Sequence, residues 1–173
     1  NAIKELCRTP LHIMMVLHIK NKLPKDVKNI DLYNAFITES LVLQEKKDKN
    51  YYSADLKKVL AQIAFQTEMT FSHSSLLEQM STIAKEEQWE KKYEQELIAK
   101  LLKIELLQEQ ENGAYTFSHQ RVRDYFIALY MNTHPFDATT LFKRTSVLPL
   151  YAGLLDDPKE LIYAIFSAYA KTA

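Results

Sequence analysis

His119 occupies a position where a histidine could bind a phosphate group. It belongs to the run YTFSHQRVRDYFIALY, residues 115–130, which follows a tight Asn112-Gly113 turn and begins a helix. We expect His119 in the first turn of that helix, where free backbone N–H groups point outward and favour an anion. A phosphate bound there could also accept a hydrogen bond from the imidazole. The alternative is a capping or half-buried histidine that only packs against the preceding hairpin.

Two arginines lie beside His119 in the sequence. Arg123 is one helical turn further along the chain, so it shares roughly the same helix face as His119. We expect Arg121 and Arg123 to belong to a solvated helix surface with Asp124 nearby. A contact of either arginine with a phosphate or a partner is the alternative.

Other kinds of catalytic or metal chemistry find no support in the sequence. His12 and His18 face different directions on the expected helix, and no His-Glu-x-x-His occurs. No Ser/His/Asp set is identifiable, and Cys7 shows no sign of activation. Gly113 and Gly153 are the only glycines, so the chain cannot contain a Gly-x-x-x-x-Gly-Lys phosphate loop. We therefore expect no enzyme activity, no catalytic residue and no metal site in this chain.

Helix-boundary residues and apolar periodicity predict a mainly α-helical chain. Thr9 and Pro10 begin the first helix, because threonine can cap a helix and proline fits its first position. Asp31, Ser53 and Ser118 are the expected caps of three later helices. Other predicted helices cover residues 29–47 and 90–103, with three shorter ones near 136–145, 147–155 and 159–171.

A β-hairpin is predicted over residues 106–110 and 114–117, joined by Asn112-Gly113. Asn-Gly between short strands favours a hairpin because both residues tolerate a positive φ. Phe117 and Val122 flank the expected cap and could form a hydrophobic staple. Several helices followed by a hairpin are typical of a winged-helix domain. The predicted fold is therefore a helical bundle with a winged-helix domain that contains one β-hairpin.

The charge balance limits the kinds of partner. The chain has 22 Lys plus Arg and 22 Asp plus Glu, so it lacks the basic excess usual for binding nucleic acid or anionic membranes. No apolar run reaches the roughly 18 residues of a membrane span. A single cysteine, Cys7, cannot form an internal disulfide and favours a reducing compartment. We expect a cytoplasmic protein without a membrane segment.

The run 115–130 resembles the C-terminal signature of NACHT-type NTPases, which are STAND nucleotide switches that include the NOD-like receptors. That signature has the pattern Phe-x-His-x-x-apolar-Gln-Glu-aromatic-aromatic-Ala-Ala. Arg123 replaces the usual Gln, Asp124 the usual Glu, and Ile127 the first Ala. The matching positions are Phe117, His119, Val122, Tyr125, Phe126 and Ala128. The resemblance implies that His119 contacts the β-phosphate of bound ADP and holds the protein closed.

Thr9-Pro10-Leu11 resembles a second family element, Asn/Thr-Pro-Leu at a helix start in the first helical domain. The resemblance implies that Pro10 packs against the adenine base, whereas an ordinary helix start is the alternative. Two residue pairs, Leu23-Pro24 and Leu32-Tyr33, resemble the family's step into the winged-helix domain, without its usual arginine. We expect those two pairs to be structural.

The resemblance implies three segments: residues 1–28 end a first helical domain, 29–133 form the winged-helix domain, and 134–173 begin a second helical domain. The chain does not begin with Met, and we expect it to be part of a longer protein. It would be the regulatory part of a signalling NTPase, closing over ADP or ATP held by an N-terminal NTPase core of the same chain. By family analogy, exchange of ADP for ATP would permit homo-oligomerisation and a defence response. Alone, the chain should bind nucleotide weakly or not at all.

Two other functions stay open. A winged helix could bind nucleic acid through the helix over residues 90–103, but carboxylates there and at Glu109 and Glu111 would repel phosphates. A helical scaffold that binds proteins without nucleotide is the other alternative. Loss of ADP binding in the His119→Ala variant of the full-length protein would count against that scaffold.

Overall fold

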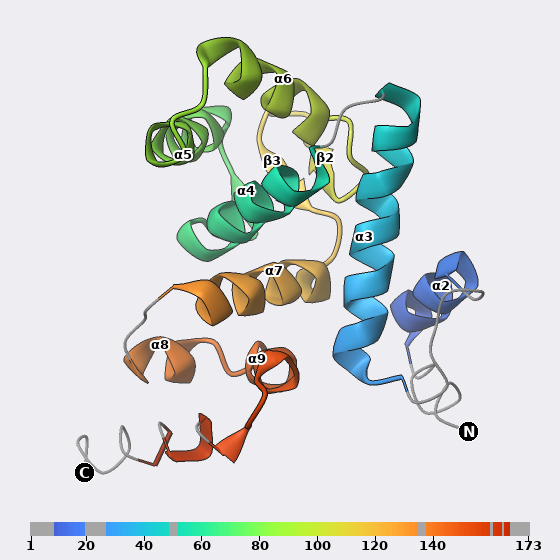
Figure 1. Ribbon diagram of the computed structural model, residues 1–173, viewed down its shortest axis with the longest axis vertical. Helices are drawn as coiled ribbons and strands as arrows, with labels where there is room; N and C mark the ends of the chain where they lie inside the picture. Colours follow the sequence, from blue (N-terminus) through green and yellow to red (C-terminus); the bar gives the residue numbers. More distant parts are fainter. Residues whose placement is uncertain are drawn as a thin grey trace.

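The computed structural model describes residues 9–19, 27–48, 52–134, 138–159, 161–163 and 165–166. Eight helices and three short strands lie within them (Figure 1). This confirms the prediction of a mainly α-helical chain. The helices are α2 (Pro10–Ile19), α3 (Asn29–Asp48), α4 (Ser53–Gln66), α5 (His73–Glu86), α6 (Lys91–Leu101), α7 (Gln120–Thr133), α8 (Ala138–Lys143) and α9 (Leu148–Leu154), and the strands are β1 (Thr70–Phe71), β2 (Leu107–Glu109) and β3 (Tyr115–Phe117).

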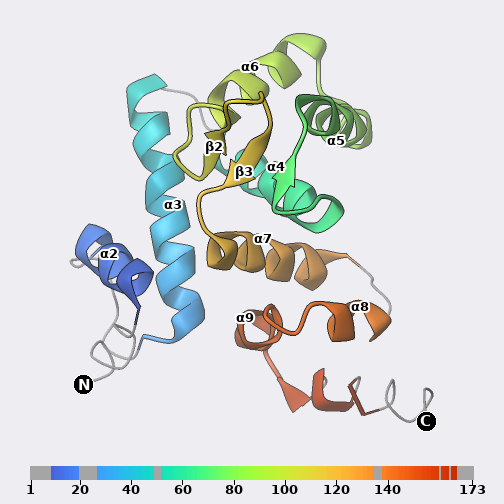
Figure 2. The same cartoon turned by 180° about the vertical axis from the view of Figure 1, so that it is seen from behind.

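The strands form one antiparallel sheet in the order β1-β3-β2 (Figure 2). The predicted hairpin is present as β2 and β3, and Gly113 has a φ of 75° in the turn between them. Asn112 supports the turn, since its Oδ1 accepts a hydrogen bond from the N–H of Ala114 at 3.0 Å. Strand β1 was not predicted, because two residues carry no alternating pattern and pair only with the distant β3.

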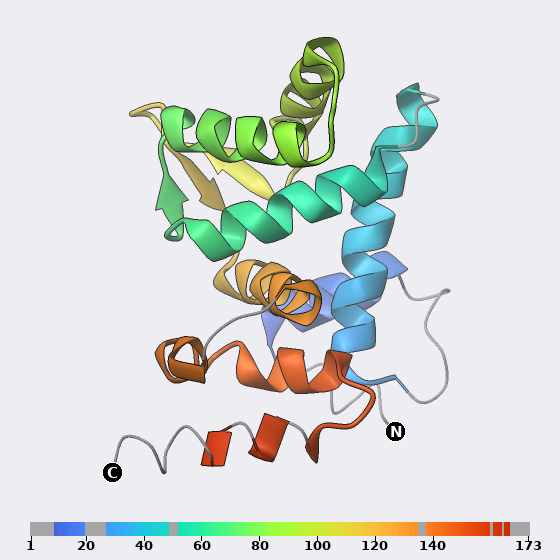
Figure 3. The ribbon, with the colours of Figure 1, turned by 60° about the vertical axis from the view of Figure 1, so that its left-hand side comes forward.

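The elements stack along the long helix α3. Figure 3 shows α5 and α6 at one end, followed by α4, α7 and then α8 with α9. Helix α7 packs between α4 and α9, while α2 packs on α3. This stacking brings the end of the hairpin and the start of α7 to the same side of the molecule as α2.

A continuous hydrophobic core runs through this stack and includes residues from all three predicted segments, such as Met15, Phe126 and Leu150. Tyr33 and Phe117 are among its largest fully buried side chains. Burial of each side chain of this size stabilises the fold by about 1.5–3 kcal/mol. The domain boundaries near residues 28 and 133 stay predictions.

Two predicted helix caps are wrong. Asp31 lies inside α3, and its carboxylate accepts a hydrogen bond from the backbone N–H of Lys28 at 2.9 Å. A carboxylate in the first turn can satisfy a free N–H from within the helix and also favours the positive end of the helix dipole. Helix α4 begins at Ser53 itself, so Tyr52 occupies the cap position.

The C-terminal helices agree with the prediction where they are described. Helices α8 and α9 fall within two of the predicted ranges, and residues 159, 161–163 and 165–166 are helical. Cys7 and the Leu23-Pro24 pair lie outside the described residues.

Candidate functional site

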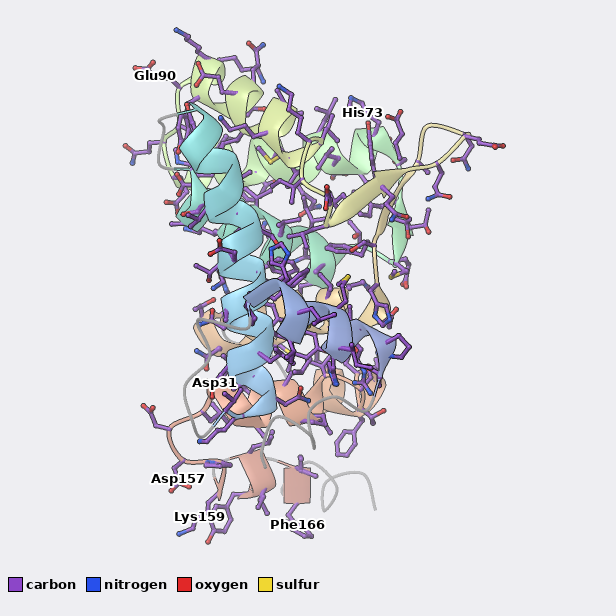
Figure 4. All side chains as sticks on the ribbon, turned by 90° about the vertical axis from the view of Figure 1, so that its right-hand side faces the viewer. Asp31, His73, Glu90, Asp157, Lys159 and Phe166 are labelled. Atoms are coloured by element: carbon purple, nitrogen blue, oxygen red, sulfur yellow. The ribbon has the colours of Figure 1, made fainter. Side chains whose placement is uncertain are left out.

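A cleft of about 1710 Å³ lies between α2, α3, the segment that joins α6 to β2, and the start of α7. Figure 4 faces the side of the molecule on which α2 lies across α3. Both Pro10 and His119 line this cleft, although they are far apart in the sequence. The fold therefore brings the two predicted site residues to the walls of one cleft.

His119 is the N-cap of α7 rather than a member of its first turn. Its backbone is extended, with φ −156° and ψ 139°, and its Nδ1 accepts a hydrogen bond from the backbone N–H of Arg121 at 3.1 Å. The prediction that Ser118 caps this helix is therefore wrong. The N–H of Ser118 donates to the carbonyl oxygen of Leu106 at 2.9 Å, which keeps Ser118 in register with the hairpin.

The cap leaves one ring nitrogen of His119 for a ligand. Because a backbone N–H can only donate, Nδ1 of His119 is the acceptor, and the neutral ring carries its proton on Nε2. The His119 side chain is exposed at the cleft. The imidazole Nε2–H, rather than the N–H of Arg121, is thus the group that could donate to a phosphate.

Pro10 is the first residue of α2, as predicted, and Thr9 caps this helix. The Oγ1 of Thr9 accepts a hydrogen bond from the N–H of His12 at 3.3 Å. Met14 and Leu17 follow on the cleft side, and the Leu17 side chain is 66% exposed. Pro10 therefore stands at the end of an exposed apolar wall that a flat, apolar group could cover.

His12 and Tyr33 meet in the wall of the cleft, and neither was predicted as a site residue. The Nε2 of His12 lies 3.0 Å from the hydroxyl of Tyr33, and the two rings meet edge to face. Burial raises the pKa of Tyr33 to about 12, Arg121 opposes the rise and Asp124 adds to it. No sequence pattern could reveal this pair, because it forms only when α2 packs on α3.

Arg121 lies at the edge of the cleft with its side chain 49% exposed. Its Nη1 donates a hydrogen bond to the carbonyl oxygen of Ser146 at 3.0 Å and lies 3.7 Å from Oδ2 of Asp124. Asp124 is almost fully buried, and its Oδ1 accepts from Nε2 of Gln120 at 2.8 Å. The predicted solvated surface holds only in part, since Arg121 also makes a contact with the α8–α9 connection.

Arg123 does not share the cleft, so its prediction as a surface neighbour of His119 is wrong. It donates a hydrogen bond to the carbonyl oxygen of Thr67, just after α4, and Arg144 donates to the carbonyl oxygen of Phe65 at 2.7 Å. The last carbonyl groups of a helix lack partners within it and attract cations. Burial lowers the pKa of the Arg123 guanidinium, while Glu68 and Asp124 raise it.

The remaining cleft residues combine apolar surface with several groups that can carry positive charge. Among the described residues that line the cleft, Glu105 is the one carboxylate. A concave site of mainly apolar lining with a few polar groups is typical of small-molecule sites. The basic side chains are His12, His18, Lys103, His119 and Arg121, and the phenyl and phenol rings are Tyr33 and Phe36.

No group of three or more metal-ligating side chains occurs in the ranges that the structure describes. Across the same ranges, no helix has both the length and the apolar character needed to cross a membrane. No family model, no curated protein and no solved structure matches the chain. Its function must therefore be argued from the cleft.

Proposed function

We propose that the chain is the regulatory part of a NACHT-type signalling NTPase. In this proposal the cleft closes over ADP or ATP that an NTPase core of the same protein holds, with His119 on the β-phosphate and Pro10 against the adenine base. One observation carries the proposal: Pro10 and His119 belong to separate family-like motifs, and both line a single cleft. Nothing in either motif alone requires that meeting.

The chemistry of the cleft supports a nucleotide as ligand. At the start of α7, His119 and Arg121 offer hydrogen-bond donors to a phosphate. Along α2, Pro10 and the exposed Met14 and Leu17 offer apolar surface to a base. A ligand with a charged end and a flat apolar end would match both walls.

The order of elements also supports the proposal. Helix α4, strand β1, helices α5 and α6, and the β2–β3 hairpin follow one another, and β3 is the central strand of the sheet. We propose that this unit is the winged helix that the sequence predicts. Helix α7, which His119 caps, then follows the wing directly as in the family pattern.

The regulation that we propose is a two-state closure. Bound ADP would favour the closed state through the contacts of His119, and exchange for ATP would favour the open state, in which copies of the protein assemble. The described contacts are few, so we expect a dissociation constant of about 1 mM or weaker for ADP and the chain alone.

Nucleic-acid binding is less well supported. In a winged helix, α6 would enter the major groove. Lys91 of α6 pairs with Glu94 at 2.9 Å, and Lys100 lies 4.5 Å above the ring of Tyr52. Since these cations already have partners and carboxylates lie among them, α6 offers little net attraction to phosphates.

The proposal can be tested by titrating ADP into the labelled chain and following the spectrum by NMR. His119→Ala and Pro10→Ala should each weaken binding, His119→Ala by about tenfold, the value of one charge-assisted hydrogen bond. His73→Ala is the matched control, because His73 is an exposed histidine at the start of α5 and lies outside the cleft (Figure 4). Equal affinity in all three variants would contradict the proposal, as would micromolar binding to the chain alone.

A further inference from the structure

We propose that Arg121 is a second phosphate-binding residue of the cleft, and that an oligophosphate bound there releases the contact between Arg121 and the α8–α9 connection. This inference rests on the proposed function. It starts from one juxtaposition: Arg121 lines the cleft, while its Nη1 donates to the carbonyl oxygen of Ser146 at 3.0 Å. A single guanidinium therefore joins the ligand site to residues 144–147, the connection between α8 and α9.

The Arg121 side chain donates one hydrogen bond to the described residues and forms an ion pair with the buried Asp124, so most of its five N–H groups stay available to a phosphate. The acceptor on Ser146 is a neutral carbonyl oxygen, and the 3.7 Å separation from Asp124 is too long for a hydrogen bond. A guanidinium–phosphate pair has charges on both sides and can form two parallel hydrogen bonds, whereas the contact with Ser146 is a single hydrogen bond to a neutral acceptor. The exposed guanidinium can turn toward a ligand, whereas buried Asp124 stays bonded to Gln120.

Two donors at the start of α7 also define the ligand class. His119 offers a single Nε2–H, and Arg121 offers a planar fork two residues further on. Together they can contact two phosphate groups of one molecule. The cleft should therefore distinguish ADP or pyrophosphate from AMP or orthophosphate.

Release of Arg121 from Ser146 would affect α9, because Ser146 lies in the connection that leads into the N-terminus of α9. That connection is held at one end by Arg144, which contacts the carbonyl oxygen of Phe65, and at the other by Arg121 on Ser146. Loss of the second contact leaves the start of α9 with fewer bonds to the rest of the fold. Because α9 packs on both α7 and α3 (Figure 3), occupancy of the cleft would be sensed by the C-terminal helices.

Hydrogen exchange in the whole chain tests this coupling. Arg121→Gln without ligand should speed the exchange of the amides of residues 147–151, except Pro149, which has no N–H, by about fivefold, the factor for one average hydrogen bond. Saturating pyrophosphate should produce a similar increase in the unmodified chain and no further increase in Arg121→Gln. Lys143→Gln is the control, since Lys143 is an exposed cation on α8 outside the cleft.

The outcomes separate the inference from the proposed function. ADP that shifts the His119 resonances without changing exchange at residues 147–151 would overturn the coupling and leave the proposed function intact. Absence of any shift at His119 at ADP concentrations well above the expected dissociation constant of about 1 mM would contradict the proposed function. Unchanged exchange in ligand-free Arg121→Gln would independently overturn the contact with Ser146. Equal affinity for AMP and ADP would overturn the role of Arg121 as a second phosphate ligand. The titrations of the unmodified chain decide these points even if Arg121→Gln does not fold.

Discussion

Replacing Arg144 with methionine should lower the free energy of unfolding by about 2 kcal/mol. The Arg144 guanidinium donates to the carbonyl oxygen of Phe65 at 2.7 Å and lies 4.6 Å from the centroid of the Phe65 ring. A hydrogen bond from a charged group contributes about 1.5–3 kcal/mol and an exposed cation–π contact about 0.5–1 kcal/mol. Arg144 is half-buried, and this burial together with the neighbouring Arg123 lowers the pKa of its guanidinium, so partial desolvation of the charge reduces the net gain.

Urea unfolding followed by circular dichroism measures this change. Arg144→Met keeps the length of the side chain and removes its charge, so the midpoint should fall while the slope with denaturant stays constant. Arg144→Lys should recover part of the loss, because lysine keeps the charge but lacks the planar fork. Lys143→Met, one residue away on the exposed side of α8, is the matched control.

A loss below about 0.5 kcal/mol in Arg144→Met, equal to that of the control, would refute this reasoning. Such a result would mean that the guanidinium does not hold the end of α4 in solution. The connection between α8 and α9 would then depend on packing alone.

Four further outcomes are expected. Burial raises the pKa of Tyr33 from 10.0 to about 12, so the stability that the protonated hydroxyl contributes is complete below pH 10 and is lost as the pH rises toward 12. The free energy of unfolding should therefore fall less between pH 10 and 12 in Tyr33→Phe than in the unmodified chain, and an equal fall would contradict this. Gly153→Val should cost about 1–3 kcal/mol by thermal unfolding, because even a Cβ there would lie 3.1 Å from Ile30; an unchanged melting temperature would exclude close packing of α9 on α3. Gly113→Ala should cost about 1 kcal/mol in urea, since φ is 75° with open space around it, and a neutral effect would argue for a different turn. Phe117→Ala should cost about 3–5 kcal/mol in the same assay, and less than 1 would place its ring outside the core.

The sequence predicts the helices and the hairpin because their signals are local. Apolar spacing, the Thr9-Pro10 helix start and the Asn112-Gly113 turn each act within a few residues, and the structure has the expected element at each. Strand β1 could not be predicted in this way, since its two residues gain their partners only from β3.

In the candidate site, too, local features are predictable from the sequence, and features that depend on tertiary packing are not. His119 and Pro10 could be selected from local sequence, but their meeting depends on how α2 packs on α3 and how α7 follows the hairpin. Local sequence favours Ser118 as the cap of α7, because serine is a common cap residue. The hydrogen bond from the N–H of Ser118 to Leu106 keeps Ser118 with the hairpin, so the cap is the next residue, His119. Helical spacing alone puts Arg123 on the same face as His119. In the structure its guanidinium donates instead to the carbonyl oxygen of Thr67, just after α4.

The central claim is that the cleft between α2 and the start of α7 holds a nucleotide with its base on Pro10. Intermolecular nuclear Overhauser effects between the adenine protons of ADP and the labelled chain test it most directly. We expect contacts from the adenine protons to Pro10 and to the exposed side chains of Met14 and Leu17. Adenine contacts confined to exposed aromatic rings outside the cleft, such as Tyr163 and Phe166, would contradict the claim.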